Sequence, residues 1–375
     1  MKFFKAGLCL GLAALALVGC KRSDDVITVG CMAPFTGEGA TYGRSVRRGV
    51  ELAVDEINTN KRLNKPLKVI YEDDRMEPKE GLNAFHKLVD VDRVPVILGP
   101  FGSSIVLSVA PLANESKTVI ISASATADQI ADAGDYVYRI VPPNSKQGYD
   151  LAQFALRKLG AKRAAILYQT NDYGITLRDA FVKTFQSAGG TILRTEGYPL
   201  GATDYRAALT QMKPLKPDVI FFPLHQKEAA LMLRQAKELG VTATFISADG
   251  AYTNDLISAA GGAADGAYFS TMALAYGVAD DQIKAFQEAF KKRFGEDPDV
   301  YSAYYYEVTK LIAQTMRDTG TSSIAIKHGL DAMTGSSAYH GITGETAFDS
   351  KGEVRKNFYI YQVRNGTFVL IGPPL

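Results

Sequence analysis

Short apolar runs alternate with segments of helical periodicity along the chain from residue 26 onward. The segment 42–60 places Val46, Val50 and Ile57 at helical spacing, which predicts an amphipathic helix, and residues 78–90 repeat the pattern. The apolar runs of strand length in this part are 27–35, 66–74, 94–100, 117–124 and 136–142. Strands that alternate with helices predict a parallel sheet covered on both faces.

A second series of the same kind begins with a predicted helix at 146–159. Its predicted strands are 163–170, 190–199, 218–224, 243–250 and 266–272. Two such series predict an α/β protein with two doubly wound parallel-sheet lobes. The alternation then stops, because residues 280–335 have helical patterns and residues 341–371 are typical of strands. Asn365-Gly366, between two apolar runs, predicts a hairpin turn.

The N-terminus has a different pattern, in which two lysines precede the apolar run 6–18. A helix of that length spans about 20 Å, which is too short to cross a ~30 Å hydrocarbon core. Residues 1–19 are therefore predicted to be a secretory signal peptide. The run ends in Leu-Val-Gly-Cys, which resembles the bacterial lipobox. This resemblance implies a lipidated Cys20, a tether over 20–25 and a protein anchored to a membrane in the periplasm or cell envelope. The alternative is an ordinary signal peptide with an incidental cysteine.

Charge and cysteine content exclude several functional classes. Without residues 1–19 the chain holds 40 basic and 40 acidic residues, so nothing favours nucleic-acid binding. Once Cys20 is lipidated, Cys31 is left alone, which excludes an internal disulfide and favours a packing role. No cluster has zinc-binding spacing. The histidines are scattered at His86, His225, His328 and His340. We therefore expect neither a metal nor a cofactor.

The loop Gly-Pro-Phe-Gly-Ser-Ser at the start of 99–113 contains candidate nucleophiles. A hydrolase nucleophile elbow needs Gly-x-Ser-x-Gly, but residues 102–106 are Gly-Ser-Ser-Ile-Val. The sequence also lacks the Gly-Lys-Ser/Thr of a phosphate-binding loop. The glycines of 37–43 miss the dinucleotide-binding spacing by one residue. We therefore expect that the protein is not an enzyme.

Small hydroxyl residues follow two of the predicted strands. Ser103 and Ser104 come after the strand at 94–100, and Thr126 comes after the strand at 117–124. Ligands of open α/β sheets bind outside the carboxyl ends of the strands, and helix N-termini attract anions. Ser103 and Thr126 are therefore candidates to hold one small carboxylate. The alternative is that Ser103 or Ser104 is only a helix N-cap.

The motifs GPFGSS, SASAT, NDYG, LRQAKELG, ADG and FDSKGEV occur in characteristic order and spacing over residues 26–371. On these motifs the sequence resembles the branched-chain amino-acid-binding proteins of bacterial ABC importers, which are leucine/isoleucine/valine-type solute-binding proteins with a type I periplasmic fold. The resemblance implies two lobes joined by a three-crossover hinge. It places 26–142 and 275–353 in lobe 1, and 143–274 and 354–371 in lobe 2.

The resemblance also implies ligand contacts on the first lobe. It assigns α-carboxylate binding to Ser103 and Thr126, and it includes Ala125 in the same segment. The backbone carbonyl of Ser124 is expected to accept a hydrogen bond from the ammonium. Independently of the resemblance, a desolvated zwitterion needs donors at one end and a carboxylate at the other.

On the second lobe, Asp249 matches the family's acidic partner of the ammonium, and Tyr173 matches a tyrosine that closes over the ligand. The alternatives are a turn acid and a helix-start tyrosine. The residues that match the family's pocket walls are Tyr42, Phe101, His225 and Tyr301. Tyr42 alternatively packs only on its own helix, and some of the tyrosines in 301–306 are expected in the core.

His225 and Asp249 depart from the leucine-type pattern, which often has a tyrosine and the longer glutamate at these positions. The aromatic walls still favour an apolar α-amino acid, with branched-chain side chains first and aromatic ones next. The implied partners are an ABC permease and its ATPase, and a monomer is expected. The alternative is a sensor of amino acids, amides or organic acids that works with a signalling partner.

Overall fold

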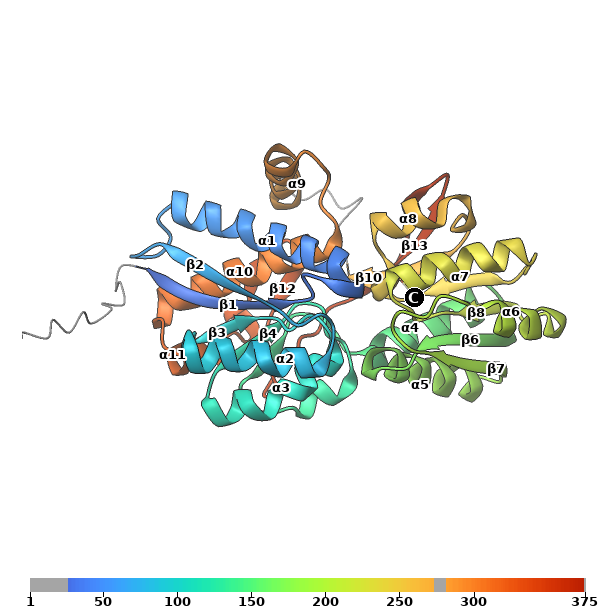
Figure 1. Ribbon diagram of the computed structural model, residues 1–375, viewed down its shortest axis with the longest axis horizontal. Helices are drawn as coiled ribbons and strands as arrows, with labels where there is room; N and C mark the ends of the chain where they lie inside the picture. Colours follow the sequence, from blue (N-terminus) through green and yellow to red (C-terminus); the bar gives the residue numbers. More distant parts are fainter. Residues whose placement is uncertain (1–25, 273–280, 374–375) are drawn as a thin grey trace, which may run out of the picture.

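Two β-sheets covered by helices form the two lobes of the computed structural model, which describes residues 26–272 and 281–373 (Figure 1). The predicted α/β class with two parallel-sheet lobes is confirmed. The predicted signal peptide, the lipidation site Cys20 and the whole tether over 20–25 lie outside the described residues. None of the described helices is both long and apolar enough to cross a membrane.

The first sheet has five parallel strands in the order β2-β1-β3-β4-β5. The strands are β1 (Ile27–Ala33), β2 (Leu67–Asp73), β3 (Val96–Leu98), β4 (Val119–Ser122) and β5 (Val137–Arg139). The connecting helices are α1 (Ala40–Thr59), α2 (Pro78–His86) and α3 (Ser103–Ser116), with a π turn at Lys87–Val91 and 3₁₀ turns at Gly37–Gly39 and Asp128–Asp132. Every residue of β3 and β4 is buried, as expected for central strands with helices on both faces.

The second sheet has the order β14-β13-β10-β9-β8-β6-β7, in which β13 and β14 are antiparallel additions to a parallel core. The strands are β6 (Arg163–Gln169), β7 (Thr191–Tyr198), β8 (Val219–Phe221), β9 (Thr244–Ser247), β10 (Tyr268–Met272), β13 (Phe358–Arg364) and β14 (Thr367–Gly372). The helices are α4 (Asn144–Arg157), α5 (Asp172–Ser187), α6 (Arg206–Met212), α7 (Gln226–Glu238) and α8 (Asn254–Ala260). The 3₁₀ turns are Lys213–Leu215, Asp249–Ala251 and Gly261–Ala263.

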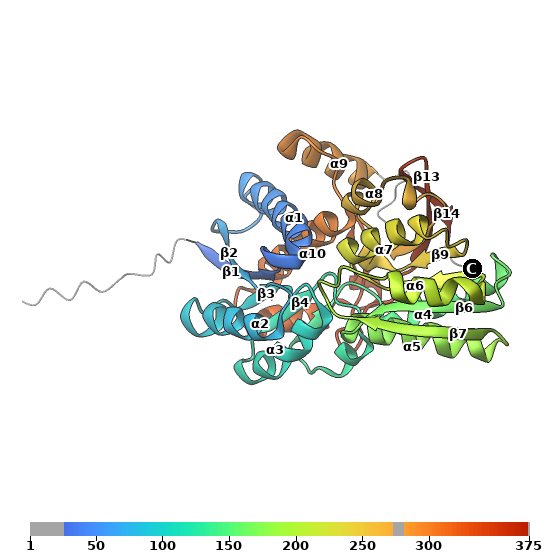
Figure 2. The ribbon, with the colours of Figure 1, turned by 45° about the vertical axis from the view of Figure 1, so that its right-hand side comes forward.

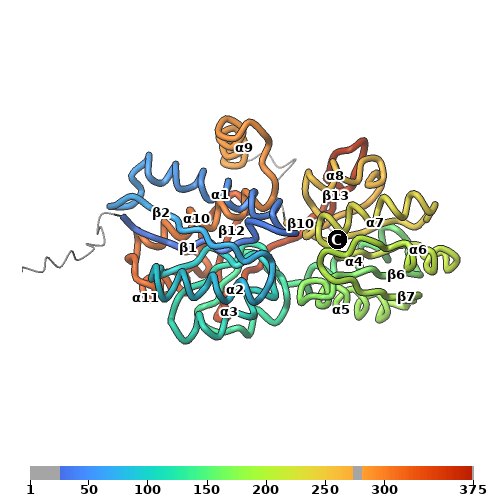
Figure 3. Tube along the Cα trace, in the orientation of Figure 1, coloured from blue at the N-terminus to red at the C-terminus, as the bar shows by residue number. Residues whose placement is uncertain are grey.

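The chain returns to the first lobe after β10, so that distant segments lie side by side. The returning elements are α9 (Asp281–Phe294), α10 (Val300–Thr319), α11 (Ser323–Asp331), a 3₁₀ turn at Gly335–Ser337, and the hairpin β11 (Tyr339–Gly341) and β12 (Gly344–Thr346). Helix α10 packs along α1, as the orange and blue tubes of Figure 3 show. The helices touch at Gly49, where an added Cβ would lie 1.9 Å from the carbonyl oxygen of Ser302.

Three segments therefore connect the lobes. They join β5 to α4, β10 to α9, and β12 to β13. Residues 273–280 of the second segment lie outside the described part. The boundaries at 142, 274 and 353 fall in or beside these segments and stay predictions.

The sequence patterns placed most elements correctly, with one clear error. Residues 347–357, which we expected to belong to strands, instead form a turn around 349–352 that is closed by a single β-bridge between Phe348 and Val354. Oδ1 of Asp349 accepts hydrogen bonds from the backbone N–H groups of Lys351 and Glu353, and Gly352 has a φ of +70°. Local side-chain bonds of this kind compete with strand pairing. The hairpin is confirmed, because Asn365 and Gly366 both have positive φ.

The lobes meet at the carboxyl ends of the parallel strands (Figure 2). Side chains cross the boundary between them. The ion pairs Arg44–Asp255 and Lys227–Glu38 join α1 and the turn before it to the second lobe. Cys31 is fully buried in the first lobe, and burial raises the pKa of its thiol far above the ordinary value. The burial agrees with the packing role expected for this residue.

Candidate functional site

Ser103 begins α3, directly after the glycine turn that follows β3. The N-cap of this helix is Gly102, with no side-chain cap, so the alternative that Ser103 or Ser104 is only an N-cap is wrong. Oγ of Ser103 instead accepts hydrogen bonds from the backbone N–H groups of Thr126 and Ala127, each at 3.1 Å. Both bonds use oxygen lone pairs, so the hydroxyl hydrogen of Ser103 is still available to an incoming acceptor. Ser103 thereby connects the two loops that the sequence analysis had paired.

Thr126 lies at the centre of the second loop and is fully buried. Its Oγ1 has no hydrogen-bond partner among the described residues. A buried hydroxyl without a partner costs about 1–3 kcal/mol. Its neighbours are firmly held, because Ala125 donates its N–H to Oγ of Ser122 at 3.0 Å and Ser124 donates its hydroxyl to the carbonyl of Phe101 at 2.8 Å.

Asp249 lies on the second lobe, at the end of β9, and only 5% of its surface is exposed. The hydroxyl of Tyr173 donates to Oδ1 of Asp249 at 3.2 Å and accepts the N–H of Gly250 at 2.8 Å. Burial raises the pKa of the Asp249 carboxyl to about 6. A side chain at Gly250 would place a Cβ 2.5 Å from that hydroxyl, so this contact requires a glycine.

His225 stacks on Tyr173, with ring centroids 5.1 Å apart. Oδ1 of Asn171 caps α5 by accepting the N–H of Gly174, so its amide nitrogen faces Nε2 of His225 at 3.2 Å. Nε2 is therefore the acceptor and Nδ1 carries the proton. Burial lowers the pKa of His225 to about 4, so the ring is neutral at pH 7. Its Nδ1 has no partner among the described residues.

Aromatic rings bridge the lobes beside these groups. Tyr42 stacks on Phe101 at 4.8 Å and meets Tyr301 edge-on at 5.3 Å. The Tyr42 hydroxyl donates to the carbonyl of Gly250, and the Tyr301 hydroxyl donates to the carbonyl of Asp249 at 2.9 Å. Tyr42 therefore does more than pack on its own helix. The expected core role of other tyrosines holds for Tyr304 and Tyr305, which are buried.

A cavity of about 490 Å³ lies where the lobes meet. Its lining includes Ser103 from the first lobe and Tyr173 and His225 from the second. At one rim of the cavity, the hydroxyl of Ser104 donates a hydrogen bond to the carboxylate of Asp172 and so links the lobes directly. The other candidate residues form the connected network next to this cavity. The structure thus brings all ten candidates into one region, and their ligand contacts stay predictions.

Three residues of this region were not predicted from the sequence, namely Asn171, Asp172 and Gln226, and Ser104 was not predicted to bridge the lobes. The N–H of Gln226 donates to the Tyr42 hydroxyl at 2.8 Å. Asn171 and Asp172 belong to the NDYG motif, where asparagine before a helix is a cap signal. Among the described residues, no group of three or more His, Cys, Asp or Glu side chains is placed to hold a metal ion.

The comparisons agree with this architecture. The family described as periplasmic binding protein matches residues 26–367. The Leu/Ile/Val-binding protein BraC3 of Rhizobium johnstonii is 30% identical, over 96% of each chain. The branched-chain amino acid transporter substrate-binding protein LivJ of Streptococcus pneumoniae, solved with isoleucine, is 27% identical with a TM-score of 0.87, over 93% of this chain and all of that chain.

A third similar protein carries a different ligand. It is an ABC-transporter solute-binding protein of Rhodopseudomonas palustris in complex with 3,4-dihydroxybenzoic acid. It is 25% identical with a TM-score of 0.83, over 93% of this chain and 97% of that chain. The resemblance drawn from the sequence motifs is confirmed. The chain belongs to the periplasmic binding protein family, whose members bind solutes, and within it the chain resembles the Leu/Ile/Val-binding proteins.

Proposed function

We propose that this protein is an extracytoplasmic, lipid-anchored solute-binding protein that captures an apolar α-amino acid between its lobes and delivers it to an ABC permease and its ATPase. The observation that carries the proposal is the placement of opposite chemistry on opposite lobes. The first lobe has hydrogen-bond donors at Ser103 and Thr126, and the second lobe has the buried carboxylate of Asp249. An α-amino acid has the complementary charges.

The first lobe supplies the carboxylate end of the site. The Ser103 hydroxyl and the unpartnered Oγ1 of Thr126 would each donate to a carboxylate oxygen. The first turn of α3 adds free backbone N–H groups and the positive end of the helix dipole. A bound carboxylate would thus remove the cost of the unpartnered Thr126 hydroxyl, and the Ser124 carbonyl would face the ammonium.

The second lobe supplies the ammonium end. The Asp249 carboxyl is costly to ionise while it is buried, as its pKa of about 6 indicates. An ammonium group within hydrogen-bond distance would favour the ionised form and offset that cost. Tyr173 holds the carboxylate through its hydroxyl and would also cover the ligand.

The ligand side chain would contact the walls formed by Phe101, Tyr42 and Tyr301. These rings stack and cross one another, and all three residues are buried, which favours an aliphatic or aromatic side chain. The similarity to Leu/Ile/Val-binding proteins supports branched-chain amino acids first. Delivery to a permease, rather than signalling as a sensor, is supported by the relatives' transporter names.

An aromatic carboxylate is the second candidate ligand. The donor end at Ser103 and Thr126 would hold any carboxylate, and one relative carries 3,4-dihydroxybenzoic acid. An α-amino acid would need Asp249 to bind its ammonium group, whereas a benzoate has no ammonium and would not need Asp249.

Calorimetric titration of leucine into the Asp249→Ala variant tests the proposal. We expect affinity to fall at least 100-fold, because the ammonium would be buried without a counter-charge. The matched control is Asp204→Ala, which removes an exposed carboxylate of the same lobe and should leave affinity unchanged. Unchanged leucine affinity in Asp249→Ala would contradict the assignment of the ammonium end.

A further inference from the structure

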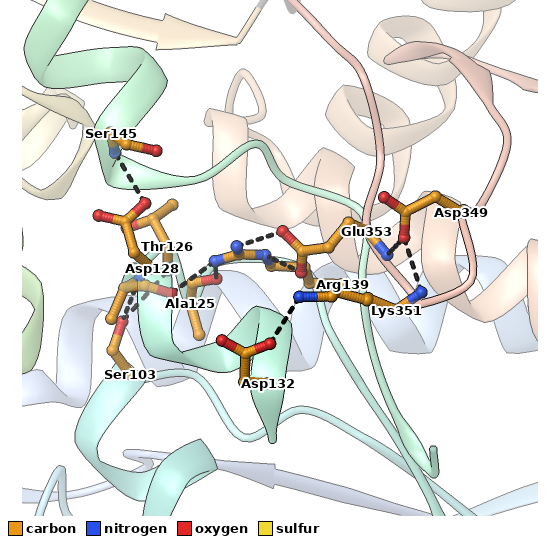
Figure 4. Close-up of polar contacts among 11 residues, drawn as sticks. Ser103, Ala125, Thr126, Asp128, Asp132, Arg139, Ser145, Asp349, Lys351 and Glu353 are labelled. Carbon is orange, nitrogen blue, oxygen red and sulfur yellow. Dashed lines mark hydrogen bonds and ion pairs between the residues drawn. The ribbon is translucent and has the colours of Figure 1, made fainter. Parts of the chain in front are cut away.

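The loop that carries Thr126 rests on a buried arginine. Arg139 is the last residue of β5 and has no exposed surface. Its Nη1 donates to the carbonyl of Ala127 at 2.8 Å and lies 3.5 Å from the carbonyl of Ala125 (Figure 4). The guanidinium therefore contacts the backbone on both sides of Thr126. None of the roles described above for the binding site uses this arginine.

The same guanidinium pairs with Glu353, far away in the sequence. Nε of Arg139 donates to Oε1 of Glu353 at 2.6 Å, and Nη2 pairs with Oε2. The backbone N–H of Arg139 also donates to the carbonyl of Gly352 at 3.1 Å. The turn that contains Glu353 is held a second time, because Lys351 pairs with Asp132 beside the binding loop at 2.6 Å. Figure 4 shows the Arg139–Glu353 and Lys351–Asp132 pairs side by side.

This cluster lies where two of the three connections between the lobes begin. The chain passes from Arg139 to α4 on one side, and from Glu353 to β13 on the other. The binding loop is also attached to the start of α4, because the carbonyl of Thr126 accepts the N–H of Asn144 at 2.7 Å. Arg139, where one connecting segment begins, thus contacts both the loop and the other connecting segment.

We propose that Arg139, held by Glu353, is a positioning residue that fixes the Ala125–Ala127 backbone for carboxylate binding and couples this loop to the hinge. The proposal rests on the carboxylate end of the proposed function. An arginine suits this role because its planar fork can bind a carboxylate with two donors and a carbonyl with a third. Its charge is fully buried and therefore needs the carboxylate of Glu353 as a partner.

Loss of the carboxylate partner would leave that charge unpaired in the interior. The guanidinium would then compete for other acceptors or admit water, and the carbonyls of Ala125 and Ala127 would lose their fixed positions. The N–H groups of Thr126 and Ala127, which now bond to Ser103, would become more mobile.

The test compares Glu353→Gln with a control that breaks another buried ion pair. Glu307 pairs with Lys356 at 3.2 Å, and Lys356 belongs to the same connecting segment as Glu353. The Glu307 carboxylate bonds to Lys356 and Thr343 rather than to the binding loop. Both substitutions should therefore lower Tm, and only Glu353→Gln should disturb the loop.

Two readouts are measured on the mature chain. Amide hydrogen exchange without ligand should accelerate at Thr126 and Ala127 at least tenfold in Glu353→Gln relative to Glu307→Gln. The Kd for leucine, measured well below both Tm values, should rise at least tenfold in Glu353→Gln only. If Glu353→Gln does not fold, Glu353→Asp, which keeps the charge but shortens the side chain, replaces it with the same expected direction.

Equal exchange at Thr126 and Ala127 in the two variants would overturn the proposal, whatever the protein binds. A Kd that rises equally in both would also overturn it, since the effect would then belong to the hinge segment in general. Failure of the proposed function is a separate result, visible as absence of leucine binding by the unsubstituted protein. In that event the exchange measurement alone decides the role of Arg139.

Discussion

Burial of the Asp249 carboxyl raises its pKa from the ordinary 3.8 to about 6, so the folded protein without ligand bears a cost at neutral pH. The hydroxyl of Tyr173 donates to this carboxylate, but the effect of burial on its pKa is larger. An uncharged side chain at position 249 would stabilise the ligand-free protein more than a carboxylate does. The cost is consistent with a site that is completed when a cation binds, and it leads to a prediction about stability.

We expect Asp249→Asn to raise the free energy of unfolding of the ligand-free protein at pH 8 by about 2–3 kcal/mol, at 1.36 kcal/mol per pKa unit. The folded-state pKa lies above the unfolded value, so the stability contributed by protonated Asp249 is complete below pH 3.8 and is lost as pH rises through 6. Wild type and variant should therefore converge near pH 4. Urea unfolding at both pH values checks this, with Asp204→Asn as an exposed control. A variant less stable than wild type at pH 8 would contradict it.

For individual residues, the sequence predicted some of these contacts but not others. Ser103 and Thr126 were predictable because hydroxyl residues at the ends of parallel strands meet at one edge of a sheet. Arg139 was not, because it interrupts an apolar run and its partner Glu353 lies 214 residues away. Pairing over such a distance depends on how the whole chain folds, which local patterns do not encode.

At the scale of elements, the close contact between α1 and α10 holds the returning helices to the first lobe. Their backbones approach closely at Gly49 and Ser302 because glycine has no side chain. Helical periodicity predicted both helices but not this contact, since periodicity identifies an apolar face without naming its partner. The prediction of strands at 347–357 was wrong for a related reason. There the local hydrogen bonds of Asp349 outweighed the preference of the apolar spacing for strands.

Gly49→Ala should destabilise the protein by roughly 2–3 kcal/mol, because the new Cβ would meet backbone atoms of Ser302 that cannot move alone. Gly262→Ala is the control, since its Cβ would lie 3.3 Å from the flexible end of Lys237. Urea unfolding of both variants measures the difference. A loss below about 0.5 kcal/mol for Gly49→Ala would show that the helices separate without cost.

At the scale of the whole molecule, side chains from both lobes hold each other in the arrangement of Figure 1. Arg44–Asp255 and Lys227–Glu38 are exposed ion pairs, which contribute little individually. The buried hydroxyl of Tyr42 is different, because it donates to Gly250 and accepts from Gln226 across the boundary. A ligand that contacts both lobes would favour this arrangement over one in which they separate.

Tyr42→Phe should raise the Kd for the ligand at least tenfold, since it removes two buried hydrogen bonds that contribute about 0.5–1.5 kcal/mol each while the ring still packs on Phe101. The ligand-free variant should also have a larger radius of gyration by small-angle X-ray scattering. Tyr205→Phe removes a buried hydroxyl whose bond to Ala202 lies within the second lobe, and it should change neither quantity. Equal effects of the two substitutions would contradict a role for Tyr42 in closure.

The central claim is that the two lobes recognise opposite ends of one α-amino acid. Calorimetric titration of residues 21–375 with leucine, its deaminated analogue and its decarboxylated analogue tests this most directly. We expect tight binding of leucine and at least 100-fold weaker binding of both analogues, because each leaves one buried group unpaired. Binding of the deaminated analogue as tight as that of leucine would contradict the role of Asp249 and point to an organic acid as the ligand.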